Sequence, residues 1–335
     1  MAADTIPQLR PITPIKVARS LHFALVLAAW LAGMGPGTAA ALTDYPFRVD
    51  TVRVGQLERV VARNDGPAPI TIHVALDSEN IGTTADWPLV AVVPAHGSLP
   101  LAYMAPVNEG EPYRYLFSYT YYVGRVDAPA STQALYRYPF PDGQAHAITQ
   151  AHGAKLSSHN NPQNLYAVDF DMPSGTPVVA ARDGVVVDVV MSHHSGGQDI
   201  SYMEHANTVT IVHDDGTIAE YAHLSPGPAL VTRGERVNAG RLLGYSGNTG
   251  YSTGPHLHFV VSRPAIEDGR VIRLSLPFHF YGDDSHAPLT PRAGTSAVAD
   301  NHTGDADAAL AARGTIEEAP LAAHPLTAHG SISRR

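Results

Sequence analysis

The chain contains no cysteine, so disulfide bonds, thiolate metal sites, cysteine nucleophiles and a lipid-modified cysteine anchor are all excluded. Any bound metal ion must therefore be held by histidines and carboxylates. Charged residues are also scarce, at 16% of 335 residues, while hydrophobic residues make up 44%. This balance permits packed cores and argues against global disorder. The length is sufficient for two ordinary domains with appendages.

Positive charge is in short supply, because 22 lysines and arginines stand against 31 aspartates and glutamates and give a formal charge of -9. No basic cluster stands out, so nonspecific binding to nucleic acid and adhesion to anionic membrane surfaces are both disfavoured. Glycine and proline are abundant by contrast, with 29 and 27 residues. They indicate many turns and short strands rather than long helices.

A long apolar run is missing as well. The uncharged residues 21–34 follow three basic residues and precede the small residues 38–41, and they are fewer than the ~20 apolar residues of a membrane-spanning helix. The pattern is typical of a secretory signal peptide, predicted over residues 1–41, with an uncleaved anchor or a buried helix as the alternative. Without an Arg-Arg pair, general export is favoured over the twin-arginine route. We therefore expect a mature protein with no stable membrane span that works in the periplasm or outside the cell.

Residues 42–147 consist of short apolar and polar runs separated by turns. Such runs occupy residues 70–76, 89–94, 99–103 and 115–123. Strands at this spacing, with no convincing helix, predict a small antiparallel β-sandwich of immunoglobulin-like style. The tyrosine-rich last run is interpreted as a half-buried strand, with a sugar-stacking surface as the alternative. No group of residues indicates chemistry here, so the predicted role is spacing, docking or shielding of the next domain.

Residues 148–282 show strands and turns again, and they complete an all-β chain. One hairpin is predicted from residues 176–181 and 185–190. A second is predicted from residues 208–213 and 217–222, because an Asp-Gly turn separates them.

The last segment, residues 283–335, is rich in Asp, Ala, Gly, Thr and Pro and has no alternating or helical periodicity. We predict that it is mostly disordered.

Two histidines, His256 and His258, stand at the start of a predicted strand that follows the glycine-rich loop 247–254. Alternate side chains of a strand share a face, so both imidazoles point one way while Leu257 and Phe259 point the other. This arrangement is a half-site for a transition metal, with zinc as the first expectation. A structural histidine pair on an exposed strand is the alternative. A phosphate-binding function of the loop is excluded, because the loop enters a strand and no lysine follows its glycines.

Further candidate ligands occur upstream of this pair. Asp169 lies inside an apolar run, where burial of an unpaired carboxylate is costly unless a cation or a metal ion is its partner. His159 opens the same segment, and His223 ends a predicted strand.

These residues stand in blocks that resemble the lysostaphin/LytM-type zinc metallopeptidases. The blocks follow the family's order: His159, YAVDFDMPSGTPV at 166–178, YAHL at 221–224 and GNTGYSTGPHLHF at 247–259. The resemblance covers about residues 145–281. Members of this family are secreted bacterial endopeptidases that cut peptide cross-bridges of peptidoglycan. Some carry a β-rich region before the peptidase domain, as expected here.

The resemblance implies a LytM-type antiparallel β-sheet peptidase domain after the sandwich. It also implies three zinc ligands, His159, Asp169 and His258, and two unligated active-site histidines, His223 and His256.

One departure from the family's pattern concerns the first ligand. His159 precedes Asp169 by ten residues, whereas some members have a spacing of four, so an inserted loop at residues 160–165 must be accommodated. His152 is the alternative first ligand and Asp171 the alternative carboxylate. The family's spacing and the tetrahedral demands of zinc favour His159, and the matching sequence context favours Asp169.

The implied function is that of an exported zinc metalloendopeptidase that hydrolyses peptide stems or cross-links of bacterial peptidoglycan. A zinc ion with three protein ligands keeps a fourth position for water and lowers the pKa of that water to about 7. His223 and His256 would then divide the tasks of general base and oxyanion stabilisation.

Two alternatives remain open. One is a catalytically latent LytM-like domain that binds cell wall or activates other wall hydrolases, and the presence of all five site positions disfavours it. The other is a wall-binding module with incidental histidines, which would leave the burial of Asp169 unexplained. Neither the bond that is cut nor the oligomeric state is predicted.

Overall fold

The computed structural model describes residues 10–11, 45–128, 134–154, 157–281 and 288–300. Within these ranges every regular element is a strand except one 3₁₀ turn, η2 (Ile200–Tyr202), which confirms the all-β prediction. No helix in this part of the chain is long and apolar enough to cross a membrane. The predicted signal peptide lies outside the described residues, apart from the two-residue strand β1 (Arg10–Pro11).

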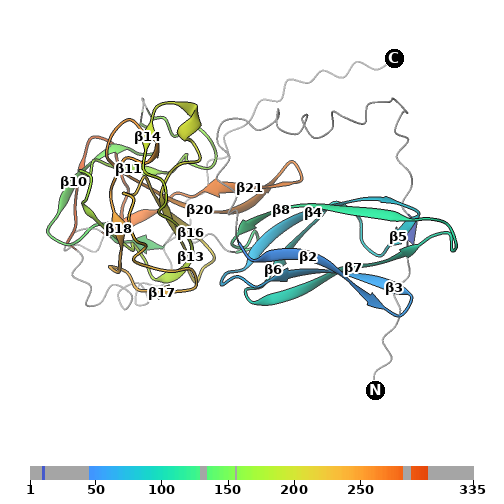
Figure 1. The fold of residues 1–335 in the computed structure, drawn as a ribbon. Coiled ribbons are helices and arrows are strands. Elements are labelled where there is room, and N and C mark those ends of the chain that lie inside the picture. Colours follow the sequence, from blue (N-terminus) through green and yellow to red (C-terminus); the bar gives the residue numbers. More distant parts are fainter. Residues whose placement is uncertain (1–9, 12–44, 129–133, 155–156, 282–287, 301–335) are drawn as a thin grey trace, which may run out of the picture. The chain divides into compact units, whose positions relative to one another are not determined.

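The N-terminal region forms two antiparallel sheets (Figure 1). The first has the order β1-β5-β7-β3-β2, with β5 (Ile81–Thr83), β7 (Gly97–Pro106), β3 (Leu57–Asn64) and β2 (Phe47–Val54). The second has the order β6-β4-β8, with β6 (Leu89–Val93), β4 (Ile70–Glu79) and β8 (Arg114–Val123).

Side chains of both sheets pack against each other. The ring of Phe47 in β2 meets that of Tyr119 in β8 edge-on, with ring centroids 5.2 Å apart. Phe117 of β8 packs against a buried core that includes Val60 and Met104 of the first sheet. Such pairing of aromatic and aliphatic side chains supports a half-buried strand at β8, as predicted. The immunoglobulin-like character of this region stays a prediction.

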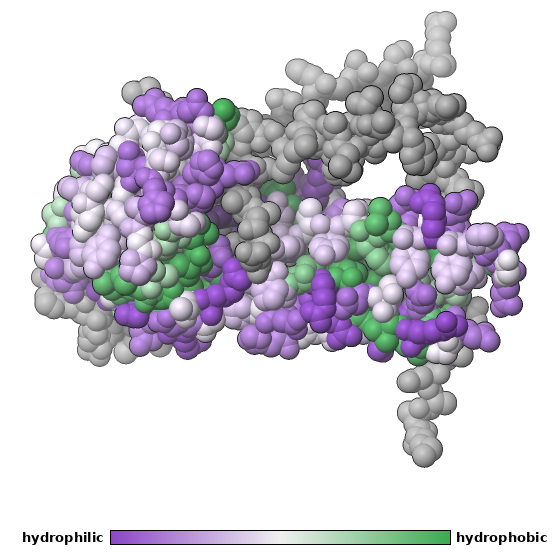
Figure 2. Space-filling view, viewed as in Figure 1, coloured by the Kyte–Doolittle hydropathy of each residue, from purple (hydrophilic) through white to green (hydrophobic). Residues whose placement is uncertain are grey.

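Apolar side chains also reach the surface of this region. Figure 2 shows them in separate patches among polar residues, and the exposed set includes Val54, Val107 and Leu116. Scattered exposure of this kind is normal for folded proteins.

The C-terminal region contains a nine-stranded sheet of order β17-β13-β15-β16-β20-β11-β10-β24, with β21 beside β20 (Figure 1). The strands are β17 (Arg236–Val237), β13 (Gly184–Val190), β15 (Thr208–Val212), β16 (Ile218–Ala222), β20 (Leu257–Glu267), β11 (Val168–Phe170), β10 (Ala145–Gln150), β24 (Ser296–Val298) and β21 (Arg270–Ser275). Smaller ladders join β12 (Pro177–Val179) to β18 (Leu242–Tyr245), β14 (Gly196–Gly197) to β19 (Gly250–Tyr251), and β22 (His279–Tyr281) to β9 (Leu135–Tyr136) and β23 (Pro288–Leu289).

One face of this sheet builds the main core. Leu257 and Phe259 of β20 and Phe170 of β11 are fully buried there. Each such side chain contributes on the order of 2 kcal/mol by leaving water, which fixes the face that each strand turns inward. Because side chains alternate along a strand, His258 and Asp169 emerge together on the opposite face.

The core also corrects the predicted start of this domain. Tyr136, Tyr138 and Phe140 are buried in the same core, and β10 pairs with β11. The boundary predicted between residues 147 and 148 is therefore wrong, because it divides β10 and separates these aromatic residues from their core. The segment that carries them contains only a two-residue strand, too short to reveal its partner in the sequence.

The predicted disordered tail is also wrong in part. Residues 288–300 contribute β23 and β24, and β24 pairs with β10 along the edge of the large sheet. Ala297 and Ala299 are buried. Strands of two and three residues carry no visible periodicity, and the neighbouring sheet supplies their partners. Residues 301–335 lie outside the described residues.

The two predicted hairpins have different outcomes. The second is confirmed, since β15 and β16 pair in register from Thr208 with Ala222 to Val212 with Ile218. The first is wrong, because β12 pairs with β18, whereas β13 pairs with β15 and β17.

Candidate metal centre and active site

Three candidate ligands converge on the sheet face opposite the core. Asp169 of β11 and His258 of β20 are direct cross-strand partners, and His258 Nδ1 lies 2.9 Å from Asp169 Oδ1. His159 Nε2 lies 3.2 Å from the other carboxylate oxygen, Oδ2. The ligand atoms of the three side chains all lie within 4.8 Å of one another, and all three residues are buried.

His159 reaches this cluster through a compact loop. The carboxamide of Asn161 accepts hydrogen bonds from the backbone N–H groups of Gln163 and Asn164, at 3.1 Å each. The N–H of Ala167 then donates to the carbonyl of Asn164 at 2.8 Å. These bonds close the extra residues into a local turn, so the ten-residue spacing between His159 and Asp169 is accommodated.

The alternative ligands do not join the cluster. His152 is exposed and its ring packs on Tyr166, with centroids 4.4 Å apart. Asp171 is exposed, in contrast to the buried Asp169.

Local hydrogen bonds orient the candidate ligands. His159 Nδ1 lies 3.2 Å from the carbonyl oxygen of Ala167, which accepts a hydrogen bond from the Nδ1–H, so Nε2 is the ring nitrogen that faces Asp169. Although burial disfavours its charged form, hydrogen bonds from His159 and His258 lower the pKa of Asp169 below its usual range. The carboxylate is therefore ionised, and two imidazoles with one carboxylate form a donor set that suits zinc.

The two further histidines lie beside this cluster. The ring centroids of His223 and His256 are 4.5 Å apart, and those of His223 and His258 are 5.8 Å apart. His223 Nδ1 is 2.7 Å from the carbonyl oxygen of Thr249, and His256 Nδ1 is 2.8 Å from that of Gly254. Each Nδ1–H therefore donates to the main chain, which leaves both Nε2 atoms as the reactive positions.

The electrostatic setting of His223 favours its neutral form. Burial lowers its pKa to about 3, and the neighbouring imidazoles of His256 and His258 act in the same direction. His223 has a left-handed backbone, with φ of 64°, which is uncommon for a residue other than glycine. Such strain tends to accumulate at functional sites.

The buried carboxamide of Asn207 and the hydroxyl of Thr249 hold the segments around His223 together. The carboxamide of Asn207 donates to the carbonyls of His193 and Leu224, at 2.8 and 3.2 Å. Thr249 Oγ1 accepts from the N–H of Asn207 at 3.0 Å and donates to the carbonyl of Leu224 at 2.8 Å. The same Thr249 supplies the carbonyl that fixes His223. Sequence reasoning did not select either residue, because nothing in the pattern distinguishes them from ordinary loop residues.

The glycine-rich loop needs its glycines for close packing. Gly250 has φ of +80°, and a Cβ there would lie 2.7 Å from the Cβ of Ala206. A Cβ at Gly247 would lie 2.6 Å from the backbone nitrogen of Ser225. Both contacts are closer than side chains tolerate, so these residues allow the loop to lie against its neighbours.

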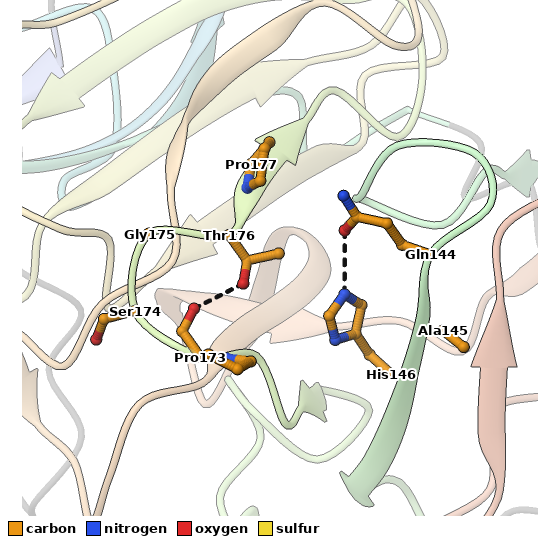
Figure 3. A pocket seen from close by; sticks show the side chains of 8 residues that line it. All are labelled: Gln144, Ala145, His146, Pro173, Ser174, Gly175, Thr176 and Pro177. Atoms are coloured by element: carbon orange, nitrogen blue, oxygen red, sulfur yellow. Dashed lines mark hydrogen bonds between the residues drawn. The ribbon is translucent and has the colours of Figure 1, made fainter.

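A separate shallow depression of about 440 Å³ lies between the start of β10 and the loop before β12. Figure 3 shows its lining, where His146 contacts Gln144 and the hydroxyl of Thr176 donates to the carbonyl of Pro173. None of the five candidate site residues lines it.

Residues 163–273 match Peptidase family M23, and the chain contains an M23 peptidase domain of the lysostaphin/LytM type, as the resemblance predicted.

Among its relatives, glycyl-glycine endopeptidase ALE-1 of Staphylococcus capitis is 44% identical over 100 residues, which are 30% of this chain and 25% of the relative. Peptidoglycan DD-endopeptidase ShyA of Vibrio cholerae is 39% identical over 115 residues, 31% of this chain and 24% of the relative. The matched part therefore spans about a quarter of the length of these relatives. Of solved structures, the catalytic domain of lysostaphin from Staphylococcus simulans is 28% identical, with 38% of this chain and 86% of that domain covered and a TM-score of 0.27.

Proposed function

We propose that this chain is an exported zinc metalloendopeptidase that cuts peptide bonds of bacterial peptidoglycan. The observation that carries the proposal is the convergence of His159, Asp169 and His258, with the rings of His223 and His256 beside them. All but His159 lie within the residues that match the M23 family.

In this proposal zinc is held by His159 through Nε2, by the carboxylate of Asp169 and by His258 through Nδ1. The set fits the ion, because catalytic zinc takes three nitrogen or oxygen ligands from the protein and keeps one position open. Bound zinc would activate a water molecule and polarise the scissile carbonyl.

We assign the general base to His223. Its low pKa keeps the ring neutral at pH 7, and its Nδ1–H donates to the Thr249 carbonyl. Nε2 is then an acceptor that takes a proton from the attacking water. His256 is assigned the complementary role, since protonated Nε2 of this ring can donate to the developing oxyanion or to the leaving amine.

The substrate class follows from the relatives' names. ALE-1 is called a glycyl-glycine endopeptidase and ShyA a peptidoglycan DD-endopeptidase. Their shared chemistry is hydrolysis of peptide bonds in peptidoglycan, so the proposed partners of this chain are peptide stems or cross-bridges of the cell wall. Export, predicted from the first 41 residues, would bring the enzyme to this substrate.

Metal analysis and digestion of purified peptidoglycan test the proposal. The purified chain should contain about one zinc ion and release peptide fragments with new termini, detected by mass spectrometry. A chelator should abolish release, and added zinc should restore it.

A chain that binds peptidoglycan without releasing termini, even with zinc at saturation, would contradict the proposal. That result would favour the latent, wall-binding alternative.

A further inference from the structure

Gln150 lies at the end of β10, where it is the cross-strand partner of Asp169. The register between β10 and β11 shifts between Ile148 and Gln150. Such irregularities re-aim side chains, and here the carboxamide of Gln150 points to the candidate metal cluster.

The carboxamide makes bonds in two directions. Its Nε2 donates to Asp169 Oδ2 at 2.8 Å. Its Oε1 accepts from the backbone N–H of Ser158 at 2.7 Å and from the Ser158 hydroxyl at 3.1 Å. Gln150 thus connects the carboxylate of one candidate ligand to the residue that precedes another, His159.

This connection compensates for the long spacing between the two ligands. The hydrogen bonds of His159 to the main chain and to Ser157 are local: its N–H donates to the Ser157 hydroxyl at 3.1 Å and its Nδ1 faces the Ala167 carbonyl. Farther along the same loop, the Pro162 carbonyl accepts from Ser275 at 2.8 Å. The side chain of Gln150 ties this loop to β10. Its N–H also occupies one lone pair of Asp169 Oδ2 and so orients the carboxylate.

We propose that Gln150 is a positioning residue for the metal centre, which holds Asp169 and His159 in ligating geometry through opposite ends of one carboxamide. This inference rests on the proposed zinc site. A glutamine suits the task because it has both a donor and an acceptor, whereas a glutamate would place a second negative charge against Asp169 and could not donate when ionised.

The test compares the zinc affinity of full-length wild type, Gln150→Met and Gln150→Asn, by competition with a chromophoric chelator. Methionine has a similar size but cannot bond to either group. Asparagine keeps both bonding groups on a side chain that is one methylene shorter, so it cannot reach both partners at once. Loss of a hydrogen bond that orients a metal ligand typically lowers metal affinity by about 10- to 100-fold. We expect a loss in this range for Gln150→Met and a smaller one for Gln150→Asn.

Gln144→Met is the matched control. Gln144 precedes the same strand, but its carboxamide contacts His146 and not the cluster, so its zinc affinity should equal that of wild type. Hydrogen exchange of the Ser158 amide in zinc-free protein gives a second readout, because exchange should accelerate in Gln150→Met and not in Gln144→Met. Excess zinc should largely restore peptidoglycan cleavage by Gln150→Met, as a positioning role requires.

Zinc affinity of both Gln150 variants within two-fold of wild type, with unchanged Ser158 exchange, would overturn the positioning role alone. A wild type that binds zinc but never cleaves peptidoglycan would overturn the proposed function and leave the positioning role testable by affinity. A wild type without zinc affinity would overturn both.

Discussion

At the scale of single residues, the proposed proton transfers depend on the Nε2 atoms of His223 and His256. Both Nδ1 atoms are engaged by main-chain carbonyls, and neither ring belongs to the three-residue ligand cluster. Replacement of either ring by alanine should lower the turnover number by about 10²- to 10⁴-fold, the typical contribution of general acid–base catalysis. Zinc content should stay near one ion per chain. Steady-state kinetics and metal analysis measure the two quantities on the same preparation.

His194→Ala is the matched control, since His194 is exposed and outside the candidate cluster. It should retain wild-type turnover. Loss of zinc from His223→Ala or His256→Ala would contradict the division of these residues into ligands and proton-transfer groups.

The five candidate site residues could be assigned from the sequence because they stand in blocks that resemble the lysostaphin/LytM-type peptidases. Gln150 and Thr249 could not, although both hold site residues in place. Their roles depend on a β-bulge and on a loop that folds back, and neither feature has a signature in a single chain.

At the scale of elements, the loop that carries His256 depends on Gly250. The positive φ and the close Cβ of Ala206 both oppose a side chain there. Gly250→Ala should therefore reduce the free energy of unfolding by about 1 to 3 kcal/mol, and it should lower turnover because Thr249 is displaced. Urea unfolding and kinetics measure these changes.

Gly254→Ala, in the same loop, provides the comparison. Gly254 does not have a positive φ, and no atom lies within 4 Å of the position that its Cβ would take. This variant should unfold as wild type does. Equal stability of the two variants would show that the packing of Gly250 on Ala206 does not constrain the loop.

Local signals decided which elements could be predicted. The Asp-Gly turn between β15 and β16 fixes a hairpin through neighbouring residues, so this hairpin is predictable from the sequence. The ladder of β12 with β18 joins segments more than 60 residues apart, and its formation depends on tertiary packing. Alternation alone could not show that β12 has this partner.

At the scale of the whole molecule, buried histidines should make the zinc-free protein sensitive to acid. Burial lowers the pKa of His213 to about 4 and that of His223 to about 3. The unfolded chain takes up protons at a pKa near 6.5, so it binds more protons than the folded chain between these values. The contribution of these histidines to the free energy of unfolding is therefore fully present above pH 6.5. It declines as the pH falls, by up to about 1.4 kcal/mol per pH unit for each histidine. The lowered pKa of Asp169 acts in the same direction at lower pH.

Urea unfolding of chelator-treated protein at pH 7.0 and at lower pH measures how the free energy of unfolding changes with pH. In the wild type, His213 Nδ1 lies 2.7 Å from the Asp183 carbonyl oxygen. His213→Asn should reduce the pH dependence, because the asparagine amide can still donate toward this carbonyl but cannot titrate. An identical pH dependence in this variant and in wild type would exclude His213 as a source of acid sensitivity.

The all-β class and the M23 domain could be predicted from composition, turns and motifs. The extent of that domain could not. Its core includes Tyr136 and Phe140, which precede the family-like sequence blocks at residues 159–259, and Ala297, which follows them. These residues lie in strands of two or three residues or in loops, where burial is decided by the completed sheet and leaves no pattern along the chain.

The carbonyls that orient His223 and His256 belong to the main chain, and no point substitution deletes a carbonyl. Asp169, by contrast, is oriented by the removable side chain of Gln150. Random substitutions can therefore disturb the orientation of Asp169 more easily than the orientation of the two imidazoles. Among inactive relatives that descend from such a chain, we expect Asp169 and Gln150 to have been replaced while His223 and His256 are retained.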